Sequence, residues 1–78
     1  MHQHTIDQRL DTSGLHCPLP LLKAKQALNK MLAGQVLEVI ATDSGSVRDF
    51  DVYVQQSDHS MLETFTQEGT YVYIIRRG

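Results

Sequence analysis

The chain has 78 residues, 41% of them hydrophobic, and a formal net charge of −2 at pH 7. This length suits one small domain, and a charge so close to balance argues against a surface that binds nucleic-acid phosphates. No apolar run approaches the ~20 residues that span a bilayer, and the first residues lack the layout of a signal peptide. We therefore expect one cytoplasmic domain over residues 1–78, frayed at residues 1–4, with neither nucleic acid nor membrane as a partner.

The first part of the chain predicts a strand followed by a helix. Residues 5–10 alternate weakly between apolar and polar side chains, which indicates a short strand that ends at Asp11. From Pro18 to Leu32 the apolar residues have helical spacing, and Gly34 stands where a left-handed C-cap would lie. The expected buried stripe of this helix consists of Leu21, Ala24, Leu28, Met31 and Leu32.

Two further elements follow, one of them ambiguous. Residues 36–41 form a nearly continuous apolar run, typical of a strand that is covered over most of its surface. Residues 46–56 have helical spacing of their apolar side chains, and Ser46 with Asp49 resembles a weak capping box. The segment Val52 to Val54 has strand propensity, but we favour a helix.

The end of the chain predicts a β-hairpin. Residues 60–67 and 70–77 are rich in β-branched and aromatic side chains, and Glu68-Gly69 between them is a two-residue turn signal. The element order is therefore strand, helix, strand, helix, strand, strand. This order predicts an α/β (α+β) two-layer sandwich, with both helices on one face of a mixed four-stranded sheet.

The single cysteine lies in a proline-rich segment before the first predicted helix. With Cys17 as the N-cap, Pro18 takes the first helical position and Pro20 the third, which leaves the Leu19 N–H to donate to the sulfur. Gly14 lets the backbone turn tightly just before this segment. Helix N-termini favour thiolates, so we expect the pKa of Cys17 to fall below the usual value of about 8.5.

A lone cysteine restricts the chemistry that the chain can perform. It can form no internal disulfide, and it has no second thiol to resolve an oxidised or loaded state. Cys17 follows the first predicted strand and Asp43 follows the second, so both should lie at the carboxyl edge of the two parallel strands. We therefore expect any sulfur chemistry at Cys17 to end on another molecule.

Several segments together carry a family resemblance: Leu10 to Pro20, Gly34, Thr42-Asp43, Ser46 to Asp49 and Tyr73 to Arg76. They resemble the TusA/SirA-like sulfur-carrier family, whose signature is Cys-Pro-x-Pro. The resemblance implies a cytoplasmic sulfurtransferase whose motif cysteine, Cys17 here, accepts sulfur as a persulfide. It also implies a cysteine desulfurase or a rhodanese-like protein as donor, an acceptor protein downstream, for example in tRNA thiolation, and no cofactor. Ser44 departs from the proline that many members have at that position.

Other polar residues receive smaller roles. His16, Lys25 and Asp43 are candidates for docking a partner protein, although we favour a cap on the second helix as the role of Asp43. His2 and His4 lie in the expected frayed segment and carry no metal-site prediction. We expect a monomer. Two alternative functions stay open, namely a small regulatory or protein-binding module in which Cys17 is incidental and a thiol redox protein.

Overall fold

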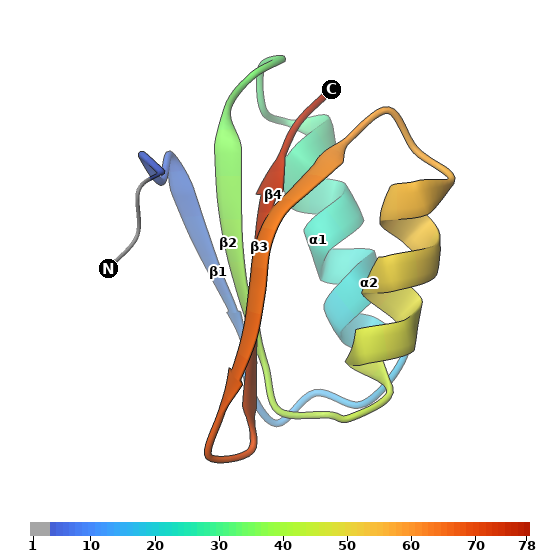
Figure 1. The fold of residues 1–78 in the computed structure, drawn as a ribbon. Coiled ribbons are helices and arrows are strands. Elements are labelled where there is room, and N and C mark those ends of the chain that lie inside the picture. Colours follow the sequence, from blue (N-terminus) through green and yellow to red (C-terminus); the bar gives the residue numbers. More distant parts are fainter. Residues whose placement is uncertain (1–3) are drawn as a thin grey trace.

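Six elements follow one another along residues 4–78, the part of the chain that the computed structural model describes. Figure 1 shows that both helices pack against one face of a sheet, as predicted. The expectations for residues 1–3, including His2, fall outside the described part. The elements are β1 (Gln8–Thr12), α1 (Leu19–Asn29), β2 (Val36–Ala41), α2 (Ser46–Gln55), β3 (Ser60–Gln67) and β4 (Thr70–Arg76).

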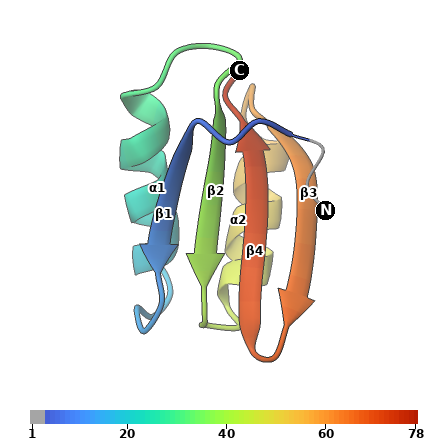
Figure 2. The ribbon, with the colours of Figure 1, turned by 90° about the vertical axis from the view of Figure 1, so that its left-hand side faces the viewer.

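The sheet has the strand order β1-β2-β4-β3 (Figure 2). β1 and β2 are parallel, whereas β4 runs antiparallel to both of its neighbours, so the predicted mixed four-stranded sheet is confirmed. Thr12 is opposite Ala41 at the ends of the parallel pair. The loops that leave β1 and β2 therefore start from the same edge of the sheet.

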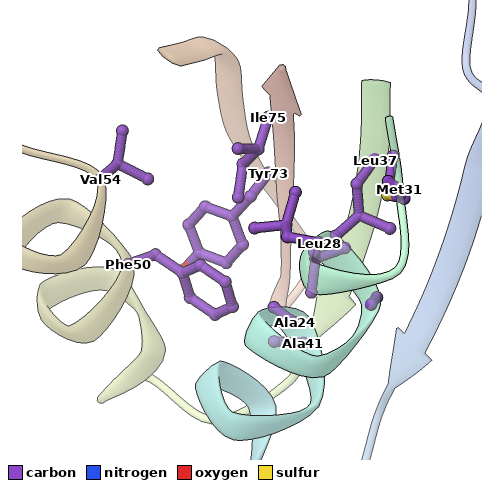
Figure 3. Packing of buried hydrophobic residues seen from close by; sticks show 11 residues of the cluster. Ala24, Leu28, Met31, Leu37, Ala41, Phe50, Val54, Tyr73 and Ile75 are labelled. Atoms are coloured by element: carbon purple, nitrogen blue, oxygen red, sulfur yellow. The ribbon is translucent and has the colours of Figure 1, made fainter. Parts of the chain in front are cut away.

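The main core lies between the sheet and the two helices. Alternate residues of the central strands face the helices, because side chains in a strand point to opposite faces in turn. Figure 3 shows the Phe50 ring of α2 against the Tyr73 ring of β4, and their centroids are 4.5 Å apart in a stacked arrangement. Phe50 and Val54 of α2 are both buried here, which confirms the choice of a helix for this segment.

A smaller apolar cluster lies on the opposite face of the sheet, away from α1 and α2 (Figure 2). Val36, Val72 and Ile74 are buried there, and Ile6, from the segment before β1, packs against them. Each central strand thus has apolar residues on both faces. This explains why residues 36–41 read as a continuous apolar run.

Several element boundaries differ from the sequence-based expectation. β1 starts at Gln8, three residues later than predicted, and ends at Thr12 instead of Asp11, because its pairing with β2 selects its residues. As an edge strand it leaves mostly exposed side chains without clear alternation. α1 ends at Asn29, and Leu32 is 71% exposed instead of joining the buried stripe. The amide of Leu32 bonds the Gln35 side chain at 2.9 Å, so Leu32 belongs to the loop before β2, as does Gly34 with its φ of +88°.

Candidate functional site at Cys17

The loop that carries Cys17 is attached to the end of β2 by hydrogen bonds. The Thr12 hydroxyl donates to the Ile40 carbonyl at 2.6 Å, and the Gly14 amide donates to the Thr42 hydroxyl at 2.9 Å. Gly14 has a φ of +82°, in the left-handed region that favours glycine, so its predicted role in a tight turn is confirmed. These contacts hold the segment before Cys17 against the end of β2.

Helix α1 begins later than predicted, and Cys17 is not its N-cap. The N-cap is Pro18, no side chain caps the helix, and Pro20 occupies the second helical position and is buried. The Leu19 amide, which was expected to donate to sulfur, donates to the His16 carbonyl at 2.8 Å. The predicted amide-to-sulfur contact is therefore wrong, because a backbone carbonyl takes that donor.

Two carboxylates approach Cys17 from other segments. The Cys17 thiol donates to Asp49 Oδ2 of α2 at 2.6 Å. Asp43, in the loop after β2, accepts from the Cys17 amide at 3.3 Å and from the Gly45 amide at 3.1 Å. His16 is highly exposed, and its Nδ1 lies 3.7 Å from Asp43 Oδ1. The predicted meeting of Cys17 and Asp43 at the carboxyl edge is confirmed.

The same contacts raise the pKa of Cys17. The hydrogen bond to Asp49 raises the pKa of the thiol, and partial desolvation and the charges of Asp49 and Asp43 raise it further. A carboxylate accepts from S–H but repels a thiolate, so the protonated form is favoured. The predicted lowering of the pKa of Cys17 is therefore wrong. The lowering was expected from the start of α1 alone, whereas the fold also brings the acidic side chain of Asp49 from α2.

Three residues of this site, Gly45, Asp49 and Asp43, were missed or misread in the sequence. Gly45 precedes α2, and a Cβ there would lie 3.2 Å from Cys17 Cβ and 2.8 Å from Asp43 Oδ2. A side chain at this position would therefore crowd Cys17. Asp49 was read as half of a capping box with Ser46, but Ser46 shares a buried hydrogen bond of 2.7 Å with the Tyr73 hydroxyl. Likewise Asp43 bonds the Gly45 and Cys17 amides and makes no side-chain cap on α2.

A groove of about 340 Å³ runs between the two helices and borders the site. Asp49 lines it, and so does Lys25, whose Nζ lies 5.0 Å from the centroid of the Tyr53 ring. His16 and Asp43 do not line this groove; they lie in the two loops beside Cys17, and Asp49 both lines the groove and bonds Cys17. The other residues that line the groove are Leu21, Arg48, Val52, Tyr53 and Gln56.

Residues 4–78 contain neither a metal-binding cluster nor a membrane-spanning helix. Within residues 4–78, no three His, Cys, Asp or Glu side chains gather in a way that could hold a metal ion. None of the helices in this part of the chain has the length and apolar character needed to cross a bilayer. The expectation that the protein uses no cofactor stays a prediction.

Comparisons with known proteins agree with the geometry. The family described as "Sulfurtransferase TusA" matches residues 8–77. The sulfur carrier protein TusA of Allochromatium vinosum is 51% identical over 72 residues, which cover 92% of this chain and 95% of that protein. A SirA-like protein from Desulfitobacterium hafniense, whose crystal structure is known, has a TM-score of 0.79 at 25% identity, over 91% of this chain and 97% of that one. With this match over nearly its whole length, the chain belongs to the TusA family of sulfur carriers.

Proposed function

We propose that this chain carries sulfur on Cys17 as a persulfide, which it accepts from one protein and passes to another. The observation that carries the proposal is an exposed lone thiol, in a Cys-Pro-x-Pro segment, in a member of a sulfurtransferase family. Exchange at sulfur requires access to the attacking thiol. Because the chain has one cysteine, no second thiol in it can attack the persulfide and release the sulfur before delivery.

The donor in this proposal is a cysteine desulfurase or a rhodanese-like protein, and the acceptor is a protein of tRNA thiolation or of another sulfur-trafficking pathway. The exchange takes place in the cytoplasm and needs no cofactor, because the sulfur stays on the cysteine. Gly14, Pro18, Leu19 and Pro20 support the reaction by shaping the loop around Cys17. The hydrogen bond of Gly14 to Thr42 and the burial of Pro20 favour this role.

Docking of donor and acceptor uses the surface around the thiol. His16 and Asp43 lie beside Cys17, and Lys25 contributes positive charge in the adjoining groove. Exposed apolar side chains flank the same edge, since Leu19 and Leu22 are each 45% exposed and Val47 is 48% exposed. A small surface of this kind suits transient complexes, in which charge acts mainly on the rate of encounter. The carrier itself acts as a monomer.

Intact-protein mass spectrometry tests the proposal. After incubation with a cysteine desulfurase, L-cysteine and pyridoxal phosphate, the protein should gain the mass of one sulfur atom, and thiol reductants should remove it. Cys17→Ser is the matched control, because it changes one exposed atom and should melt like the parent protein while gaining no sulfur.

Two results would contradict the proposal. A chain that stays unmodified with every desulfurase and rhodanese tried would favour a regulatory or protein-binding module. Formation of mixed disulfides or a sulfenic acid on Cys17, without any gain of sulfur from a donor, would favour a thiol redox protein.

A further inference from the structure

The contact between Cys17 and Asp49 joins two side chains that are 32 positions apart in the sequence. At 2.6 Å it is a short, charge-assisted hydrogen bond from a thiol to a carboxylate. Cys17 is exposed and Asp49 is partly exposed, and polar contacts of this kind between solvent-accessible groups add little to stability. A role in the chemistry of the sulfur explains the contact better than a role in folding.

The charged groups around the thiol come from several elements. Asp49 faces it from the first turn of α2, and Asp43 faces it from the loop after β2. His16, the residue before Cys17, lies 3.7 Å from Asp43, while Lys25 of α1 and Arg48 of α2 line the groove that Asp49 also lines. Among these groups of residues 4–78, it is the Asp49 carboxylate that accepts a hydrogen bond from the sulfur.

Asp49 also has a suitable position within its helix. It lies in the first turn of α2, where the partial positive charge of the helix N-terminus stabilises a carboxylate. Its side chain accepts the hydrogen bond from the Cys17 thiol. This hydrogen bond raises the pKa of Cys17, which favours the protonated form of the thiol in the empty carrier.

We propose that Asp49 is a catalytic residue that orients the Cys17 thiol and receives its proton when the sulfur attacks a donor persulfide. This inference rests on the proposed function. It goes beyond it by assigning the general base. The His16 imidazole lies 3.7 Å from the Asp43 carboxylate, and we assign it no part in this step.

The step balances in atoms and charge. Cys17 Sγ forms a bond to the terminal sulfur of the donor persulfide, the S–S bond of the donor breaks, and its electron pair stays on the donor sulfur as a thiolate. The proton leaves Cys17 for Asp49 and then passes to that thiolate. Cys17 ends as a persulfide, the donor ends as a thiol, and Asp49 is a carboxylate again. No external oxidant or reductant is needed, because the sulfane sulfur moves between two equivalent thiols.

The first test is a titration that needs no donor. Asp49→Asn keeps the shape of the side chain and removes its charge, and Asp51→Asn makes the same charge change two residues along α2, where the carboxylate bonds Gln55. Thiolate absorbance against pH should show a lower Cys17 pKa in Asp49→Asn. At pH 7 its thiolate fraction should rise roughly three- to tenfold, as expected when a like charge in contact is removed in a high dielectric. Asp51→Asn should titrate like the parent protein.

The second test measures sulfur loading with a cysteine desulfurase and L-cysteine, divided by the thiolate fraction at each pH. Asp49→Asn should load roughly tenfold more slowly per thiolate or worse, since a positioned base contributes at least that much. Asp49→Glu restores a carboxylate and should recover part of the rate. Asp51→Asn should load normally.

The outcomes separate this inference from the proposed function. Equal titration curves in Asp49→Asn and the parent protein would overturn the role of Asp49, and so would equal loading per thiolate, even with Cys17 fully loaded. Absence of loading in the parent protein would overturn the proposed function and this inference with it. A similar loss in Asp51→Asn would show a general charge effect on donor docking and would also overturn the role of Asp49.

Discussion

The helix-covered interior and the edge that carries Cys17 are built in opposite ways. In the interior, apolar side chains of β2, β4 and both helices pack together, and each reaches its place through strand or helix periodicity. At the edge, Cys17, Asp43 and Asp49 come from two loops and a helix start, and they remain accessible to solvent. Stability and reactivity therefore lie in separate parts of a small chain. A substitution can change one with little effect on the other, and the following predictions test that separation.

The largest effect on stability is expected in the interior. Phe50→Ala removes a fully buried ring that stacks on Tyr73, and it should cost about 3–5 kcal/mol of unfolding free energy, measured by urea denaturation. Because a small domain could unfold completely after such a loss, Phe50→Leu provides a milder variant. Val52→Ala, at an exposed position of the same helix, should change stability by less than about 0.5 kcal/mol. Similar losses for Phe50→Leu and Val52→Ala would contradict the assignment of stability to the interior.

A smaller effect is expected where the interior meets the start of α2. Tyr73→Phe removes the hydroxyl that bonds Ser46 and leaves the buried Ser46 hydroxyl without that partner, so it should cost about 1 kcal/mol. Ser46→Ala should cost a similar amount. The double variant should lose less than the sum of the two single losses, because the remaining group no longer lacks a partner. Strictly additive losses in urea denaturation would show that the bond contributes nothing.

The smallest effect on stability is expected at the edge. Gly45 has an ordinary helical φ of −63°, so Gly45→Ala should change the free energy of unfolding by less than about 0.5 kcal/mol. The new methyl group would press on Cys17 and on the Asp43 carboxylate, and it should slow alkylation of Cys17 severalfold. Ser44→Ala, an exposed neighbour, is the control and should react like the parent protein. Unchanged alkylation in Gly45→Ala would show that the edge tolerates crowding.

The difference between the interior and the edge also explains which features could be predicted from the sequence. Periodicity identified all six elements and the mixed sheet, since the apolar positions of β2, α2 and β4 are set by what each element buries. It erred at Leu32, an exposed apolar residue that lies three positions beyond the end of α1 at Asn29, and at β1, where an edge strand has little to bury.

The site was predicted only in part. Topology correctly brought Cys17 and Asp43 to one edge, because both follow parallel strands. The contact with Asp49 depends on how α2 leaves its loop and on the missing side chain at Gly45, and neither leaves a periodic signal. The expected direction of the Cys17 pKa was wrong for this reason, since the Asp49 carboxylate, which comes from a distant segment, raises the pKa of the thiol.

The reversed direction of β4 has a practical consequence for experiments on this chain. β4 begins at the edge where β1 and β2 end and runs back beside β2, so its final residues lie at the far end of the sheet from Cys17 (Figure 2). An affinity handle, a fluorophore or a surface linker attached after Gly78 would therefore hold the molecule with its thiol facing away from the support. Immobilised in this orientation, the chain could be used to capture donors and acceptors from solution, with Cys17→Ser as a reference surface.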